Sequence, residues 1–372
     1  MLLELDQSIE DNLDNFTSSD WESIENLAKA GRNGYHFLTG HRSLMEKLSS
    51  NDKLSRLDQY FFKRKAINYS TESSIPEIVT TRISISYNNP IHISNQEEPD
   101  RIFLALSFFT KLEGALATRL ICENISDYKI LIELAKIYAR LNRIKSFNIK
   151  FREANGGGSC TAQVIENKLN HEGKIILCVV DSDKSSSSCK IGETAKKVSS
   201  VCKMNNHRPI KLVILQAREL ENLLPVEFYK KNYTGTDYKR SNDILETIRT
   251  INSCSLLYLD YKEGLNLRTL TSDKVFYESP EWKIVLKQLK DGAFNIPKTT
   301  ECLLDGSCSD PDNCNCEFVR GYGSKVLETA ITILEREGIS MYREADKALL
   351  GSFNSLAKLV FDWGFASPEL HA

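Results

Sequence analysis

Carboxylates that directly follow a hydrophobic run carry the clearest chemical signal in this sequence. Residues 175–180 are six consecutive apolar residues, and Asp181 and Asp183 follow them two positions apart. Such a run, bounded by glycine and serine, is typical of a strand buried on both faces of a parallel sheet. Neighbouring carboxylates repel each other, and their hard oxygen atoms suit Mg²⁺ or Mn²⁺ as counter-ions. The alternative is a solvated turn capped by aspartate.

Two further carboxylate pairs follow predicted strands. They are Glu123 with Asp127, after residues 117–122, and Glu219 with Glu221, after residues 211–215. Because parallel strands end at one edge of a sheet, we expect both pairs to lie near the Asp181 and Asp183 carboxylates. A cluster of this kind holding one or two Mg²⁺ or Mn²⁺ ions is suited to in-line attack of water on a phosphodiester.

These carboxylates can meet only if the fold brings the ends of their strands together. The central block predicts strands over 117–122, 146–151, 174–180 and 211–215, separated by helices over 128–141, 160–169 and 190–204. Strands that alternate with helices of this length imply parallel pairing with right-handed crossovers. We therefore predict an α/β fold with a Rossmann-like central sheet flanked by helices.

The ordered carboxylates resemble those of the Toprim domain, which topoisomerases, bacterial primases and OLD-family nucleases share. The resemblance covers residues 115–226 and is strongest to the OLD type, on Glu123-x-x-x-Asp127, Asp181-x-Asp183, the glycines at 156–158 and the Glu-Asn-Leu-Leu stretch from Glu221. It implies a metal-dependent endonuclease. The catalytic residues that the resemblance implies are Glu123, Asp181, Asp183 and Lys262. The metal ligands that it implies are Glu123, Asp127, Asp181, Asp183, Ser185 and Glu221. Glu219 competes with Glu221 for the last of these roles. Lys262 would stabilise transition-state charge.

The sequence departs from these relatives in two ways. Asn124 follows Glu123 where the Toprim signature has glycine, and the Glu113-Gly114 pair that does match lies in a helical context. OLD nucleases usually carry an ATPase domain before Toprim, but no Gly-x-x-x-x-Gly-Lys-Ser/Thr motif occurs here. The resemblance therefore implies a stand-alone effector of anti-phage defence, of the abortive-infection kind, that a partner ATPase controls in trans.

Several alternatives stay open at this point. The substrate is DNA or RNA, with transfer RNA included, and the chain is a monomer or a homodimer. A non-catalytic Toprim-like module that binds a partner, or a primase or topoisomerase, would share the same fold. An Asp181→Ala variant that folds but loses activity would separate an enzyme from a binding module.

The regions on either side of the central block, residues 1–114 and 227–372, are predicted to be mainly helical. The predicted elements are helices over 21–30, 101–116, 242–249, 280–289, 324–337 and 349–363, and a strand over 79–87. The basic triplet Lys63-Arg64-Lys65 is either a solvated helix face or a nucleic-acid contact. Four cysteines are either free thiols or the ligands of a structural Zn²⁺, namely Cys302, Cys308, Cys314 and Cys316.

Composition limits the classes of function. The chain has 372 residues, 41% of them hydrophobic, and a net charge of −2, so a nucleic acid would have to bind through a local patch, a metal or a partner. No stretch approaches the roughly 20 apolar residues of a membrane span. The first residues lack the basic region of a signal peptide, and ten cysteines suit reduced thiols. We therefore expect a cytoplasmic protein that binds no membrane.

Overall fold

The computed structural model describes residues 1–88, 92–94, 101–145, 147–171, 173–292, 294, 317–343 and 345–369. The chain forms two compact units. Unit 1 comprises Met1–Val179, Lys197–Val213 and Ala357–Ala372, and unit 2 comprises Val180–Lys196 and Ile214–Leu356. The predicted cysteine site, Cys302 to Cys316, lies outside the described residues.

The N-terminal part of unit 1 is built on a five-stranded sheet with the order β2-β1-β3-β5-β4. The strands are β1 (Leu2–Leu5), β2 (Phe37–Gly40), β3 (Arg82–Ser86), β4 (His92–Ser94) and β5 (Arg101–Ala105). All neighbours pair in parallel except β4, which pairs with β5 in the antiparallel direction. The helices of this part are α1 (Gln7–Asp11), α2 (Ser18–Arg32), α3 (Arg42–Ser49), α4 (Arg56–Ile67), α5 (Tyr69–Glu72), α6 (Ile75–Ile78) and α7 (Leu112–Ala115).

This sheet corrects the prediction of a mainly helical N-terminal region. β1 and β2 have four residues each, which is too short for a period of two to stand out. The predicted helix over 101–116 is wrong in its first half, because β5 alternates buried Ile102 and Leu104 with half-exposed residues. The predicted helix over 21–30 is confirmed as α2, whose N-terminus is capped by Thr17.

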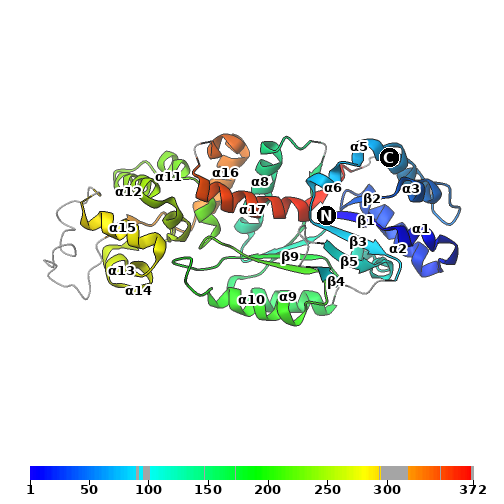
Figure 1. The fold of residues 1–372 in the computed structure, drawn as a ribbon, viewed down its shortest axis with the longest axis horizontal. Coiled ribbons are helices and arrows are strands. Elements are labelled where there is room, and N and C mark those ends of the chain that lie inside the picture. The colour runs from blue at the N-terminus through cyan, green and yellow to red at the C-terminus, as the bar shows by residue number, and fades with distance from the viewer. Residues whose placement is uncertain are drawn as a thin grey trace. The chain divides into compact units, whose positions relative to one another are not determined.

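The second sheet of unit 1 follows the predicted alternation of strands and helices, in the order β8-β6-β9-β10. Its strands are β6 (Arg119–Cys122), β8 (Arg152–Asn155), β9 (Ile176–Val180) and β10 (Ile210–Ile214). β6 pairs in parallel with both β8 and β9, and every residue of β9 is buried, as the apolar run predicts. Figure 1 shows α9 (Thr161–His171) and α10 (Glu193–Met204) on one side of the sheet and α8 (Ile125–Leu141) on the other. The fold class is therefore α/β, with parallel sheets flanked by helices.

The path of the chain reverses direction in this sheet between β6 and β9. From β6 the chain runs outward to β8 and then returns to the other side of β6 to form β9. In open α/β sheets, ligands bind outside the carboxyl ends of the strands at such a switch point. The predicted second strand, 146–151, is displaced: the sheet uses β8, whereas β7 (Asn148–Ile149) pairs with β13 (Phe365–Ala366).

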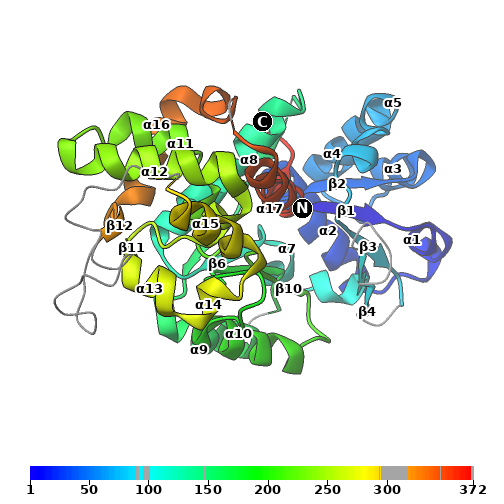
Figure 2. The same cartoon turned by 60° about the vertical axis from the view of Figure 1, so that its left-hand side comes forward.

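The described part of unit 2 consists mainly of helices, together with one short antiparallel pair of strands. Its elements include α11 (Val226–Asn232), α12 (Thr236–Asn252), α13 (Leu267–Ser272), α14 (Lys274–Tyr277), α15 (Pro280–Lys290), α16 (Val326–Glu337), most of α17 (Lys347–Gly364), β11 (Gly264–Asn266) and β12 (Glu317–Arg320). Figure 2 shows α11, α12 and α15 side by side. The predicted helices over 242–249, 280–289, 324–337 and 349–363 are confirmed as α12, α15, α16 and α17.

Packed tyrosine rings form part of the core of unit 2. The Tyr229 ring centroid lies 4.4 Å from that of Tyr261 and 4.7 Å from that of Tyr322. All three side chains are buried. The stack fixes the segment around Tyr261 against α11. None of the described helices is long and apolar enough to cross a membrane.

Candidate functional site

Lys262 joins two of the predicted carboxylates in unit 2. Its Nζ atom lies 3.2 Å from Glu219 Oε2 and 3.1 Å from Glu221 Oε1. The Glu221 side chain is only 1% exposed, so its charge depends on a close cation. Burial opposes the charge on Lys262, but attraction by Glu221 and Glu219 outweighs it and raises the lysine pKa above its ordinary value. Lys262 is therefore a permanent cation at neutral pH.

The remaining charges of this cluster act on the same groups. Burial raises the pKa of Glu219, the charge on Lys262 lowers it, and repulsion by Glu221 and Asp260 raises it further. Asp181 also raises the pKa of Lys262. Glu219, Glu221 and Asp260 therefore lie close enough to influence one another electrostatically, and Asp181 lies close enough to act on Lys262.

Asn222 connects the segment that carries Glu219 and Glu221 to the segment that leads to Lys262. Its Oδ1 atom accepts a hydrogen bond of 2.9 Å from the Glu219 backbone N–H, which caps the short helix η4 (Leu220–Leu223). Its Nδ2 atom donates to the carbonyl oxygens of Leu256 and Leu259, each at 2.8 Å. The sequence contains Asn222 in the Glu-Asn-Leu-Leu stretch but does not reveal that it ties η4 to the segment leading to Lys262.

The Asp181–Asp183 segment has an unusual backbone. Asp183 adopts φ 54°, in the left-handed region that few residues other than glycine visit. Its backbone N–H donates to the Arg218 carbonyl oxygen at 3.1 Å. A Cβ atom added at Gly192 would collide with the Asp183 carboxylate, so a glycine is required there. Strained backbone of this kind persists where the surrounding structure fixes it, and it is common at functional sites.

Arg218 is a further member of the cluster that sequence reasoning missed. Its Nη2 atom lies 2.8 Å from Asp260 Oδ2, and its Nη1 atom donates to Ser185 Oγ at 3.0 Å. The sequence feature that could have indicated Arg218 is its position directly before Glu219, where a cation would offset the carboxylate charge. The Ser185 hydroxyl, an implied metal ligand, thus accepts a hydrogen bond from a guanidinium.

Glu123 and Asp127 belong to unit 1. The glycine turn lies beside the end of β6, because Gly156 N–H donates to the Cys122 carbonyl oxygen at 2.7 Å and Gly158 N–H donates to that of Glu123 at 3.2 Å. Asp127 is buried and closes a capping box at the start of α8, since its Oδ2 atom accepts a hydrogen bond of 2.8 Å from Asn124 N–H. The carboxylate that the resemblance assigns to metal thus also stabilises a helix end.

The carboxylate oxygens of this cluster are suitable ligands for a hard divalent cation, but their positions are not those of a formed metal site. Carboxylate oxygens are the preferred protein ligands of Mg²⁺. In the part of the chain that the structure describes, however, no three His, Cys, Asp or Glu side chains are placed to bind one metal ion. The ammonium of Lys262 lies between Glu219 and Glu221, where it competes with a metal for the same oxygen atoms.

Comparison of the chain with protein-family models, with curated proteins and with solved structures finds no match. The resemblance to Toprim nucleases therefore stays a prediction from the residues and their order in this sequence.

Proposed function

We propose that this protein is a Mg²⁺-dependent endonuclease that hydrolyses phosphodiester bonds in DNA or RNA. The main support is the pair of Glu219 and buried Glu221 with Lys262 between them, within electrostatic reach of Asp181. Acidic side chains gathered with a fixed cation suit a reaction in which a bound metal and an ammonium share the charge of a phosphoryl group.

Each residue of the proposed site has a distinct role. Asp181, Asp183 and Glu221 would supply oxygen ligands, with Glu219 as the competing ligand. The resemblance also implies Glu123 and Asp127 as ligands. A bound Mg²⁺ would activate water and stabilise the leaving oxygen. Lys262 keeps its proton and stabilises developing negative charge on the phosphate. Arg218 positions Ser185 and Asp260 through its two hydrogen bonds.

Control by a partner is part of the proposal. Proteins that track a phosphate backbone unaided usually present a basic surface, but this chain has a net charge of −2. We therefore propose that an ATPase in trans, as in anti-phage defence, delivers the substrate or releases the activity.

A non-catalytic binding module is the alternative, and one observation favours it. Lys262 already neutralises much of the charge of Glu219 and Glu221, so the cluster needs no metal in order to be stable. In that case the acidic set would be a structural ion-pair network.

A cleavage assay with a matched control tests the proposal. Purified wild type, Asp181→Asn and Asp243→Asn are incubated at low salt with supercoiled DNA or total RNA, in Mg²⁺, Mn²⁺ or EDTA. Asp243 is an exposed carboxylate on α12 of the same unit. At low salt, where the substrate can bind without the partner, we expect weak metal-dependent cutting by wild type and Asp243→Asn that Asp181→Asn lacks. Equal cutting by all three proteins would contradict the assignment, and no cutting together with no metal binding would favour the binding module.

A further inference from the structure

Unit 1 contains a cavity that the proposed nuclease does not use. It has a volume of about 580 Å³ and lies among β2, α4, α5, α6 and the segment that follows β13. This volume is within the range of about 300–1,000 Å³ typical of small-molecule sites. Its apolar wall includes Phe37, Phe61, Ile75 and Ile78.

The charged groups of this cavity have an excess of positive charge. Its lining includes three cations, Arg64, Lys65 and Lys145, but only one carboxylate, that of Glu72. Glu72 Oε2 lies 2.9 Å from Lys65 Nζ, so this ion pair accounts for the one acid. Arg64 and Lys145 are exposed at the protein surface. An anion is the ligand that these two side chains would attract.

The positive charge of Lys65 is disfavoured by its surroundings. Its side chain is only 8% exposed, and its Nζ atom lies 3.7 Å from the centroid of the Phe37 ring. Burial lowers its pKa, Glu72 opposes this effect, and repulsion by Arg64 lowers the pKa further. A second negative charge near Arg64 would relieve that repulsion.

A buried hydroxyl also lines the cavity. Ser367 is 8% exposed, and its Oγ atom finds no hydrogen-bond partner among the described residues. A buried polar group without a partner costs free energy that a ligand can recover. Asn68 and Thr71 add further polar groups to the lining. An alkyl chain could not use these groups, whereas a sugar or a nucleobase could.

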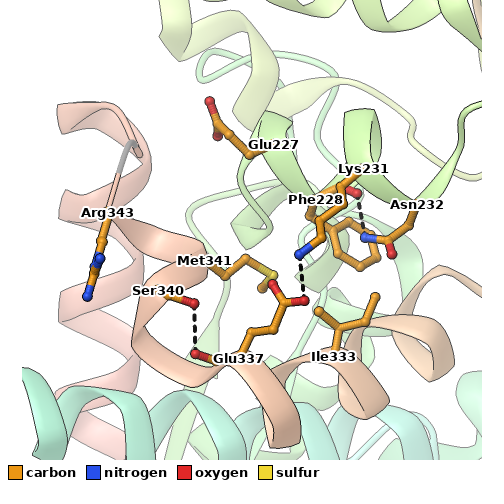
Figure 3. A pocket seen from close by; sticks show the side chains of 9 residues that line it. All are labelled: Glu227, Phe228, Lys231, Asn232, Ile333, Glu337, Ser340, Met341 and Arg343. Carbon is orange, nitrogen blue, oxygen red and sulfur yellow. Dashed lines mark hydrogen bonds and ion pairs between the residues drawn. The ribbon is translucent and has the colours of Figure 1, made fainter.

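Another cavity among the described residues lacks this excess of positive charge. It lies in unit 2, has a volume of about 360 Å³ and is shown in Figure 3. Lys231 Nζ lies 2.6 Å from Glu337 Oε1 across it, and Glu227 forms an ion pair with Arg249. Its lining holds two carboxylates, both in ion pairs, and two cations, Lys231 and Arg343, so it has no excess of positive charge.

We propose that the cavity in unit 1 binds a nucleoside phosphate. The phosphate lies against Arg64 and Lys145, and the nucleoside lies against the apolar wall within reach of the Ser367 hydroxyl. The site is independent of the proposed nuclease residues and requires no metal.

Isothermal titration of the full chain in EDTA tests this proposal, with AMP, GMP, CMP and UMP as probes and with adenosine, inorganic phosphate and hexyl phosphate for comparison. We expect at least one nucleotide to bind at a ratio of one, and at least tenfold more tightly than adenosine, inorganic phosphate or hexyl phosphate. Hexyl phosphate that bound as tightly as every nucleotide would contradict a nucleoside site. No saturable nucleotide binding below 1 mM would overturn the proposal.

Matched variants locate the site. Arg64→Ala and Lys63→Ala remove neighbouring exposed cations of α4, but only Arg64 lines the cavity. We expect Arg64→Ala to weaken nucleotide binding at least tenfold, Ser367→Ala to weaken it several-fold, and Lys63→Ala to change it less than twofold. Equal losses in Arg64→Ala and Lys63→Ala would show that the nucleotide binds elsewhere and would overturn the proposal.

Discussion

Lys262 is a single ammonium shared by two carboxylates, and this arrangement determines how the site responds to mutation and pH. Glu221 is almost completely buried, and Glu219 has a pKa that burial raises and Lys262 lowers. Without the ammonium, Glu221 would keep its buried charge and Glu219 would lose the cation that most lowers its pKa. The stability of unit 2 should therefore depend on Lys262 whether or not the site is catalytic.

We predict that Lys262→Met lowers the free energy of unfolding by about 3 kcal/mol at pH 7, the lower end for a broken buried ion pair, because Lys262 is 30% exposed. The variant raises the folded-state pKa of Glu219 further, so its penalty is largest above that pKa and shrinks as the pH falls and the carboxyl group gains a proton. In wild type, the contribution of Lys262 is present below the pKa of an unfolded lysine and is lost as the pH rises through its raised folded-state pKa.

Urea denaturation of this variant at pH 7 and pH 5 checks that prediction. Lys274→Met is the control, because the ion pair of Lys274 with Glu278 is 71% and 56% exposed. The control should lose less than about 0.5 kcal/mol. Equal losses in the two variants, or a Lys262→Met penalty that does not change with pH, would contradict the buried bridge.

Asp183 should show opposite effects on stability and function. The backbone of residue 183 is left-handed, with φ 54°, and glycine adopts this conformation without strain whereas alanine does not. Asp183→Gly should therefore be about 1 kcal/mol more stable than Asp183→Ala. Both variants should lose metal binding and cleavage, because both remove the carboxylate. Urea denaturation compares the two proteins. An alanine variant as stable as the glycine variant would show that this backbone is not strained.

At the scale of elements, the structure separates what the sequence could predict from what it could not. The buried strand β9 was predicted because six consecutive apolar residues between glycine and serine are typical of a strand covered on both faces. β1, β2 and the displacement to β8 were missed because strands of four residues carry little periodicity of their own. In the site, the carboxylates were predicted from their positions after strands. Asn222 and Arg218 were missed because their roles depend on contacts with residues 256–260.

Asp127 tests whether a capping residue also binds metal. The capping box requires only an acceptor for Asn124 N–H, which asparagine supplies as well as aspartate. We predict that Asp127→Asn costs less than about 0.5 kcal/mol of stability, whereas Asp127→Ala costs about 1 kcal/mol. If Asp127 is a ligand, the asparagine variant also weakens metal binding at least tenfold. Unchanged metal binding in Asp127→Asn would leave only the capping role.

At the scale of the whole molecule, net charge sets the expected behaviour toward nucleic acids. A chain with a net charge of −2 should bind duplex DNA more weakly than a dissociation constant of about 10 μM at physiological salt. Fluorescence anisotropy with a labelled duplex at 50 and 200 mM KCl measures this affinity. Submicromolar binding, or efficient cleavage by the purified chain alone at physiological salt, would contradict the proposed dependence on a partner.

The most direct test of the central claim is calorimetric titration of the purified chain with Mn²⁺ and Mg²⁺, because metal binding needs neither substrate nor partner. The proposed site predicts saturable binding of one or two ions by wild type and by Asp243→Asn, and at least tenfold weaker binding by Asp181→Asn with folding intact. If wild type binds no divalent ion at millimolar concentration, or if Asp181→Asn binds as wild type does, the acidic cluster around Lys262 is a structural ion-pair network and not a metal-dependent active site.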